Sequence, residues 1–350
     1  MKYWNEIIIN NIDIQGKRKR FCNNIFTLDI ETTSCFRLNG KMYPAIEYQY
    51  LSKDEQEICE KFSFMYIWQF SIDDIVYYGR TWEELKKFLD ILEEEIPERK
   101  IVFVHNLSFE FQFMRSAFNF HDVMARNARH VMKAFLDDYN IELRCSYMMS
   151  NCSLARLAEI YKLPVKKRVG DLDYTLIRNS KTVLFEEELG YCEDDCLVVY
   201  YYIKLELETY KTVDKIPLTA TGHVRREFRS RTITNWKYKN KVYKAINTEP
   251  HIYNLLVEAF QGGYTHSNWI YTDEVLQNID SYDFTSSYPF VMVSEKYPST
   301  EFKKCNIKSV ENMISRFAYI VVVRFTNIKS KYYNNFISLS KCRHIRRCKI

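Results

Sequence analysis

The stretch Ile25-Phe26-Thr27-Leu28-Asp29-Ile30-Glu31-Thr32 is the clearest indication of the fold, because apolar and polar residues alternate along it. A period of two is typical of a β-strand with one buried face. The apolar residues would face a core, and Asp29 and Glu31 would project side by side from the opposite face. Paired carboxylates on a strand are one half of a candidate metal site.

The sequence on either side of this strand predicts an α/β fold. Thr81 and Glu84 have the spacing of a capping box that opens a helix. Residues 101–104 form an apolar run that predicts a buried strand. Further strands are predicted at 62–70 and 74–78, and further helices at 109–117 and 184–207. Strands with crossover helices and a late acidic helix indicate an α/β sheet of the RNase-H-like exonuclease kind.

Four carboxylates fall where such a fold could bring them together. Glu110 would lie in the first turn of its helix, and Asp195 would share a helix face with Tyr191, one turn earlier. Phosphodiester hydrolysis is well served by two divalent ions about 4 Å apart, which need clustered oxygen ligands. We therefore predict a metal site of Asp29, Glu31, Glu110 and Asp195, with Tyr191 holding the attacking water. Each short pattern alone is more often a chance feature, so the prediction depends on their order and spacing.

Length and charge predict two domains. The 350 residues exceed the roughly 100 to 200 of a usual single domain. Residues 1–215 carry 29 basic and 35 acidic side chains, whereas residues 216–350 carry 21 and 10. We place the boundary there because the charge changes sign and Pro217 interrupts the helical pattern. The second part is where a polyanion would be held.

Composition also indicates a compartment. No apolar run reaches the roughly 18 residues that a membrane span needs, and the amino terminus lacks a signal-like stretch. The ten cysteines include no C-x-x-C pair, which favours packing cysteines in a reducing compartment over a zinc site. We expect a cytosolic protein with no membrane partner.

The densest basic stretch runs from Arg225 to Lys244, where Glu227 is the only acid. Aromatic residues interleave with the cations, which suits a groove that holds nucleic acid. The alternative is a solvated face with a few anchoring aromatic rings. The predicted DNA contacts in this stretch are Arg229, Lys237 and Lys241.

These motifs resemble those of the protein-primed family B DNA polymerases of phages and linear plasmids. Residues 27–33 are similar to the first exonuclease motif, and residues 105–110 to the second, with Glu110 in place of the usual Asp. The resemblance implies that Thr32, Asn106 and Phe109 contact the frayed primer end. Ser146 matches a further such contact by its spacing. Phe109 could instead be a core residue.

Residues 170–174 resemble the stretch that follows the catalytic lysine of the family. An apparent insertion of two residues leaves Lys166, Lys167 and Arg168 as alternatives for that position, and we favour Lys167. Residues 260–264 resemble the Tyr-x-Gly-Gly element that links the exonuclease and polymerase domains. This implies DNA contacts from Phe260, Gly262 and Gly263; an ordinary hairpin turn is the alternative.

Residues 283–289 resemble the first carboxylate motif of the family's polymerase site, with Ser287 in place of Leu. By resemblance, Asp283 and the carbonyl of Phe284 would bind metal. Ser286 would contact the triphosphate, and Tyr288 would screen the sugar. The second metal-binding Asp and the fingers Lys are not found in the sequence.

The resemblance therefore implies a fold of two parts. An RNase-H-like 3′-5′ exonuclease domain at 1–215 would precede, at 216–350, a linker and an incomplete polymerase palm. Strands at 317–326 and 336–339 would begin the insertion that binds the priming protein. A fragment, one half of a split gene and a decayed copy all stay open.

The implied cofactors are two divalent ions per site, Mg²⁺ or Mn²⁺. The implied partners are single-stranded and primer-template DNA, deoxynucleoside triphosphates, a priming terminal protein and a carboxy-terminal polymerase half. Two alternatives remain: a free-standing 3′-5′ exonuclease, and a non-catalytic module that binds single-stranded DNA or the priming protein. Residues 262–263 and 283–289 argue against the first, and the intact carboxylates argue against the second.

Overall fold

The computed structural model describes residues 1–127, 130–168, 173, 175–260, 263, 269–295, 297, 302, 319–321 and 326. The chain divides into two compact units, Met1–Arg229 and Ser230–Ile350. The sequence boundary at 215/216 falls inside the first unit, because Val213 and Ile216 are buried in its core. The functional assignment of the two parts stays a prediction.

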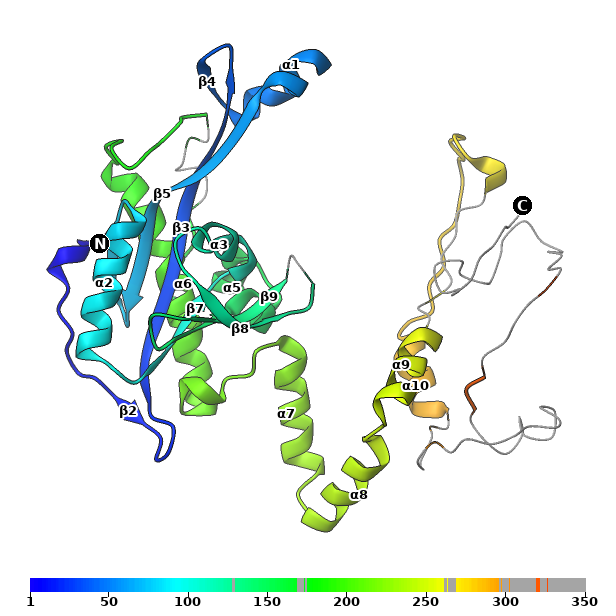
Figure 1. Cartoon of the computed structure of the whole chain (residues 1–350). Helices are drawn as coiled ribbons and strands as arrows, with labels where there is room; N and C mark the ends of the chain where they lie inside the picture. Colours follow the sequence, from blue (N-terminus) through cyan, green and yellow to red (C-terminus); the bar gives the residue numbers. More distant parts are fainter. Residues whose placement is uncertain are drawn as a thin grey trace. The chain divides into compact units, whose positions relative to one another are not determined.

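The first unit is built on one mixed sheet (Figure 1). Its described strands pair in the order β1-β6-β5-β3-β7-β10-β9-β8, with β2 and β4 also paired to β3. The strands are β1 (Lys2–Tyr3), β2 (Ile14–Gln15), β3 (Phe21–Leu38), β4 (Lys41–Pro44), β5 (Glu60–Ile72), β6 (Ile75–Gly79), β7 (Arg99–Val104), β8 (Phe120–Ala125), β9 (Val131–Leu136) and β10 (Ile141–Cys145).

The order of the central strands has the RNase-H-like form. β5 is antiparallel to β3 and β6, whereas β7 is parallel to β3 and β10 is parallel to β7. β3, β5 and β6 thus form an antiparallel meander, and the parallel strands β7 and β10 follow on the other side of β3. The prediction of an RNase-H-like α/β fold is confirmed.

Helices cover both faces of this sheet. The helices of the first unit are α1 (Lys53–Ile58), α2 (Trp82–Glu95), α3 (Leu107–Met114), α4 (Ser146–Ser150), α5 (Leu154–Ile160), α6 (Glu186–Tyr210) and α7 (Ala220–Thr232), with 3-10 turns η1 (Trp4–Glu6), η2 (Ala45–Tyr50) and η3 (Val213–Lys215). The predicted capping box of α2 is present, since the amide of Glu84 donates to the Thr81 hydroxyl at 3.2 Å.

The alternation in β3 divides the core into two layers. Phe26, Leu28 and Ile30 pack with α2 on one face of the sheet. The opposite face packs against α5 and α6. Because residues of odd and even number face opposite ways, Asp29 and Glu31 point from β3 toward the face that α6 covers.

β3 extends well past the stretch that the sequence predicts. The pairing of β3 with β5 shifts in register between Glu31 and Thr32. The strand then continues to Leu38, where it also pairs with β4 in a ribbon that projects from the sheet (Figure 1). Phe36 remains buried in this ribbon because its ring stacks on Tyr43 at 5.4 Å. The register shift, a bulge in the pairing of β3 with β5, comes directly after Glu31 and so lies beside the paired carboxylates.

The regular elements in the described part of the second unit are helices. They comprise α8 (Trp236–Ile246), α9 (Pro250–Ala259), η4 (Trp269–Tyr271) and α10 (Ser287–Ser294). The strands predicted at 317–326 and 336–339 lie outside the described residues, apart from 319–321 and 326. Among the helices that the structure describes, none combines the length and apolarity needed to cross a bilayer.

Candidate metal centre

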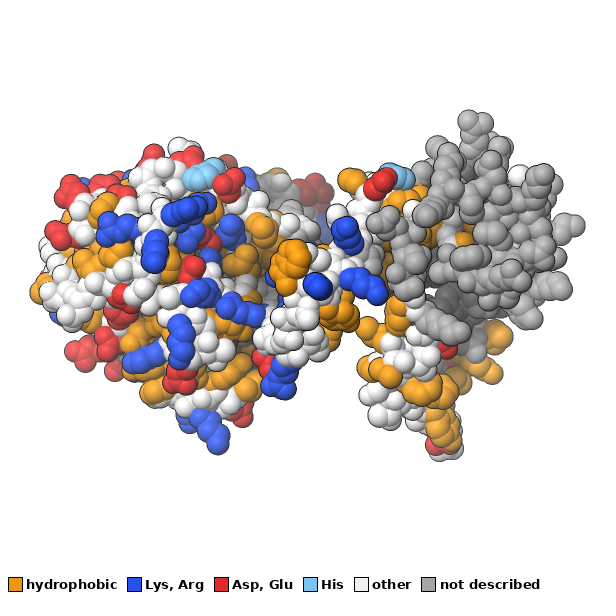
Figure 2. Space-filling view, turned by 90° about the horizontal axis from the view of Figure 1, so that it is seen from below, with side chains coloured by type: hydrophobic (Ala, Val, Ile, Leu, Met, Phe, Trp, Pro, Cys, Tyr) orange, Lys and Arg blue, Asp and Glu red, His pale blue; other side chains and the backbone are white. Residues whose placement is uncertain are grey.

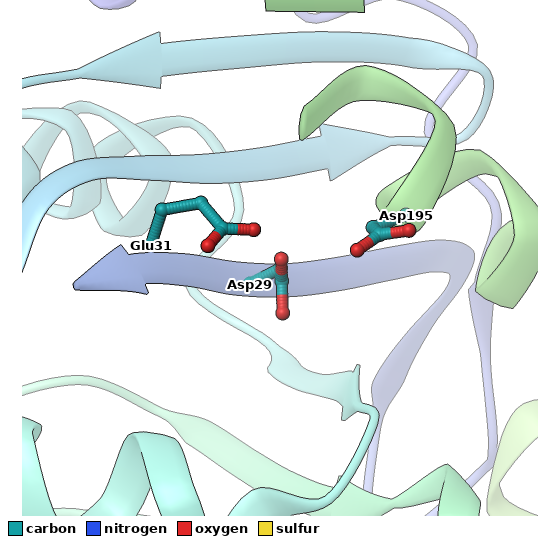
Figure 3. A group of neighbouring side chains, drawn as sticks. All are labelled: Asp29, Glu31 and Asp195. Atoms are coloured by element: carbon teal, nitrogen blue, oxygen red, sulfur yellow. The ribbon is translucent and has the colours of Figure 1, made fainter. Parts of the chain in front are cut away.

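Asp29 and Glu31 on β3 meet Asp195 on α6 (Figure 3). One carboxylate oxygen from each residue lies within 4.8 Å of the others. Asp195 is buried, with 4% of its surface exposed, whereas the two strand residues are half-buried. The strand and the helix that carry these three groups are far apart in the sequence, so the sheet and α6 together create the cluster.

Contacts on both sides of Asp195 fix the position of α6. Arg178 donates to the carboxylate of Glu188 in the first turn of α6, at 2.9 Å through Nε. Further along, the hydroxyl of Thr27 on β3 donates to the carbonyl of Cys196 at 3.4 Å. Asp195 is adjacent to Cys196, so its carboxylate is held over β3.

The clustered acids resist ionisation. Burial, and then the charge of Asp195, raise the pKa of Asp29 well above its usual range. The same two causes raise the pKa of Glu31 to about 7. Burial also raises the pKa of Asp195, although the cation of Lys167 opposes the shift. Such shifts are expected where carboxylates crowd together without enough positive charge.

Divalent cations fit this donor set. Hard cations such as Mg²⁺ and Mn²⁺ prefer carboxylate oxygens. Oδ1 of Asp195 is buried and has no hydrogen-bond partner among the described residues. An orphaned buried oxygen beside two further carboxylates is the arrangement that a bound cation would satisfy.

Glu110 lies beside the cluster but outside the 4.8 Å group. It is buried in the first turns of α3, and its Oε2 also has no partner among the described residues. Burial, and then the charge of Asp29, raise its pKa well above the usual range. Glu110 is therefore close enough to Asp29 for their charges to interact, as a fourth ligand would need to be.

The three residues that could serve as the predicted catalytic lysine make different contacts. Lys167 donates to Oδ2 of Asp195 at 2.6 Å, and its Nζ lies 5.0 Å from the ring centre of Tyr191. Arg168 instead pairs with Asp194 at 2.7 Å, and Lys166 is exposed. Lys167 thus joins the cluster to Tyr191, which is itself buried one turn before Asp195.

The predicted DNA-contacting residues of this unit differ in exposure. Thr32 is half-buried beside the bulge, and Asn106 is exposed in a left-handed conformation before α3. Phe109 is 42% exposed, so the alternative that it is a core residue is wrong. Ser146 has no exposed surface, because its hydroxyl bonds Nδ1 of His105 at 3.0 Å in the interior. Ser146 therefore has no surface in this structure for a direct DNA contact.

Two buried residues near the cluster were missed by the sequence analysis. Arg178 lowers the pKa of Glu31, against the stronger effect of burial. Gln69 lies directly opposite Asp29 in the backbone register of β3 and β5. A polar residue inside the predicted apolar strand at 62–70 was the available signal for Gln69, whereas nothing in the sequence distinguishes Arg178.

The second unit contains the candidate residues for nucleotide transfer. Asp283, Phe284, Ser286 and Tyr288 are all exposed, and Ser286 precedes α10 with a left-handed backbone. Ser287, which replaces Leu of the motif, is exposed as well. Asp283 belongs to no group of potential metal ligands among the described residues.

The predicted linker element at 260–264 and the predicted carboxylate motif at 283–289 meet at one point. A side chain added to Gly263 would collide with the hydroxyl of Tyr288. Glycine at 263 thus permits a close approach between its backbone and that ring. Phe260 is exposed at the end of α9, and Gly262 lies outside the described residues.

The predicted basic stretch spans two helices. Arg229 lies on α7, whereas Lys237 and Lys241 lie one turn apart on α8, and all three are exposed. Lys and Arg side chains on the face shown in Figure 2 are interspersed with acidic and apolar ones over the first unit.

An RNase-H-like sheet with a buried acidic centre defines a class of protein suited to metal-dependent phosphodiester chemistry. The model of the family described as DNA polymerase type B, organellar and viral, matches residues 168–346. The chain belongs to this family. The match includes Asp195 and Asp283, and it begins after Asp29, Glu31 and Glu110.

Solved structures of phi29 DNA polymerase are similar to the chain. A ternary complex with primer-template DNA and incoming nucleotides has 16% identity and a TM-score of 0.49, covering 72% of this chain and 41% of that one. A complex with single-stranded DNA has 15% identity and the same TM-score, covering 72% and 42%. The chain thus spans well under half the length of these polymerases. No curated protein matches it.

Proposed function

We propose that the first unit is the metal-dependent 3′-5′ proofreading exonuclease of a protein-primed type B DNA polymerase. The observation that carries this proposal is the meeting of Asp29, Glu31 and Asp195 within 4.8 Å on an RNase-H-like sheet. Family membership supports it, since the matched region includes Asp195. It also favours a polymerase over a free-standing nuclease.

Asp29, Glu31 and Asp195 would hold divalent cations, with Glu110 completing the set. Bound there, the two cations would activate a water and stabilise the leaving oxygen of an in-line displacement. Lys167 would orient Asp195 through its 2.6 Å hydrogen bond, and the Tyr191 hydroxyl would position the water. We propose that Thr32, Asn106 and Phe109 contact the primer end. Thr32 directly follows Glu31 on β3, the other two lie at the start of α3, and none of the three is fully buried.

We further propose that the second unit carries part of the polymerase site. Asp283 and the Phe284 carbonyl would bind metal there, while Ser286 and Tyr288 would bind the incoming nucleotide. Primer-template DNA would contact the cations of α7 and α8 together with the Gly262–Gly263 element. A priming terminal protein, a carboxy-terminal polymerase half and a cytosolic host environment complete the proposal.

One pair of variants tests the nuclease assignment. Asp195→Ala removes a predicted ligand, so the shortening of a 5′-labelled single strand with Mg²⁺ or Mn²⁺ should fall by about a hundredfold or more. Asp194→Ala is the matched control, because the adjacent acid pairs with Arg168 outside the cluster. It should retain most of the activity. Digestion by Asp195→Ala at the wild-type rate would contradict the assignment.

A further inference from the structure

Gln69 on β5 is a fully buried polar residue whose side chain has no hydrogen-bond partner in the described part of the chain. Its relative exposure is 0%, and neither its amide nitrogen nor its carbonyl oxygen has a hydrogen bond among the described residues. Burying a carboxamide without partners costs free energy that an apolar side chain of the same size would not. A residue retained at such a cost requires an explanation.

The sheet register directs this side chain toward the candidate metal centre. Gln69 is paired directly with Asp29 in the antiparallel ladder of β3 and β5. Opposed residues in such a ladder project from the same face, with Cβ atoms roughly 4.5–5.5 Å apart. The carboxamide of Gln69 therefore lies on the face from which Asp29 projects.

The next pair along the same face shows that polar groups meet across these strands. Thr27 is paired with Ser71, and their hydroxyl oxygens are 2.7 Å apart. Gln69 occupies the equivalent position one pair closer to the carboxylates, yet its amide has no such bond to Asp29.

We propose that Gln69 is a positioning residue that donates from Nε2 to the Asp29 carboxylate when the cluster holds divalent cations. This inference rests on the proposed nuclease function. An ionised carboxylate accepts several hydrogen bonds, so one oxygen can receive the amide while the other faces a cation. Groups that orient a metal ligand in this way typically change metal affinity by about 10- to 100-fold when removed.

Gln69→Met tests this role, because methionine keeps the length of the side chain and cannot donate. Titration of the full chain with Mn²⁺ by calorimetry should show binding weakened by about 10- to 100-fold. The thermal midpoint of the metal-free variant should equal or exceed that of the wild type, because an unpartnered amide has been removed. Gln69→Leu serves if the methionine variant does not fold.

Ser71→Ala is the matched control on the same strand and face. It breaks the bond to Thr27, so it should lower the thermal midpoint and leave Mn²⁺ affinity unchanged. Wild-type Mn²⁺ affinity in Gln69→Met would overturn the inference, as would an equal loss in Ser71→Ala. If Asp29→Ala binds Mn²⁺ as the wild type does, the proposed metal centre itself fails, and the role of Gln69 with it.

Discussion

Glu31→Gln should weaken a pH dependence of stability that the metal-free protein owes to its buried and crowded carboxylates. The pKa of Glu31 is about 7 in the folded chain, against a usual value of 4.5, because of burial and then the charge of Asp195. Between these values the folded state keeps a proton that the unfolded state has lost. The free energy of unfolding therefore falls as pH rises through this window, and levels off above it.

The size of the effect follows from the shift. At about 1.4 kcal/mol per pH unit, Glu31 should cost about 3 kcal/mol of stability at about pH 8 relative to about pH 4. The shifts of Asp29 and Glu110 have the same direction and add to the slope. Gln at position 31 cannot ionise, so the variant should be more stable than the wild type at the higher pH and similar to it at the lower.

Urea unfolding with a chelator present, followed by circular dichroism across this pH range, measures the difference. Glu60→Gln is the control, because Glu60 is an exposed carboxylate on β5 away from the cluster. It should leave the slope unchanged. Parallel slopes for Glu31→Gln and the wild type would show that Glu31 does not carry this proton, as would a wild-type stability that rises with pH in this window.

Two further changes test the residues around the cluster and the basic helices. Lys167→Met removes the hydrogen bond to Asp195, so we expect 3′ shortening to fall at least about tenfold, while the exposed neighbour variant Lys166→Met stays near wild type. If Lys167→Met and Lys166→Met lose the same amount of 3′ shortening activity, the loss comes from the change in net charge and not from the hydrogen bond to Asp195. Replacing Arg229, Lys237 and Lys241 by Gln should weaken binding of single-stranded DNA regardless of sequence and flatten its dependence on salt, by about 0.7 log units per lost phosphate contact. An unchanged slope in that titration would indicate a solvated face.

The sequence predicts the parts of the fold that depend on local pattern. The alternation in β3 and the capping box of α2 are local features, and both occur where the pattern indicates. Asp29, Glu31 and Asp195 could be brought together in prediction because strand and helix periodicity fix which way each side chain points.

Features that depend on tertiary pairing were not predictable in this way. The register between β3 and β5 determines which residue lies opposite Gln69, and the sequence of a single strand does not encode that register. Ser146 has the spacing of a surface contact, but packing of α4 buries it against His105. The extension of β3 past Thr32 depends on its pairing with β5 and then also with β4, so a pattern that weakens there does not end the strand.

Anomalous X-ray diffraction from crystals grown with Mn²⁺ would locate the metal ions of the proposed nuclease site. If the carboxylates form a two-metal nuclease site, two anomalous peaks about 4 Å apart should lie among Asp29, Glu31 and Asp195. Glu110 should be a ligand of one of them. Crystals of Asp29→Ala should lose at least one peak. Ordered Mn²⁺ elsewhere on the chain, with none at these three carboxylates, would contradict the account.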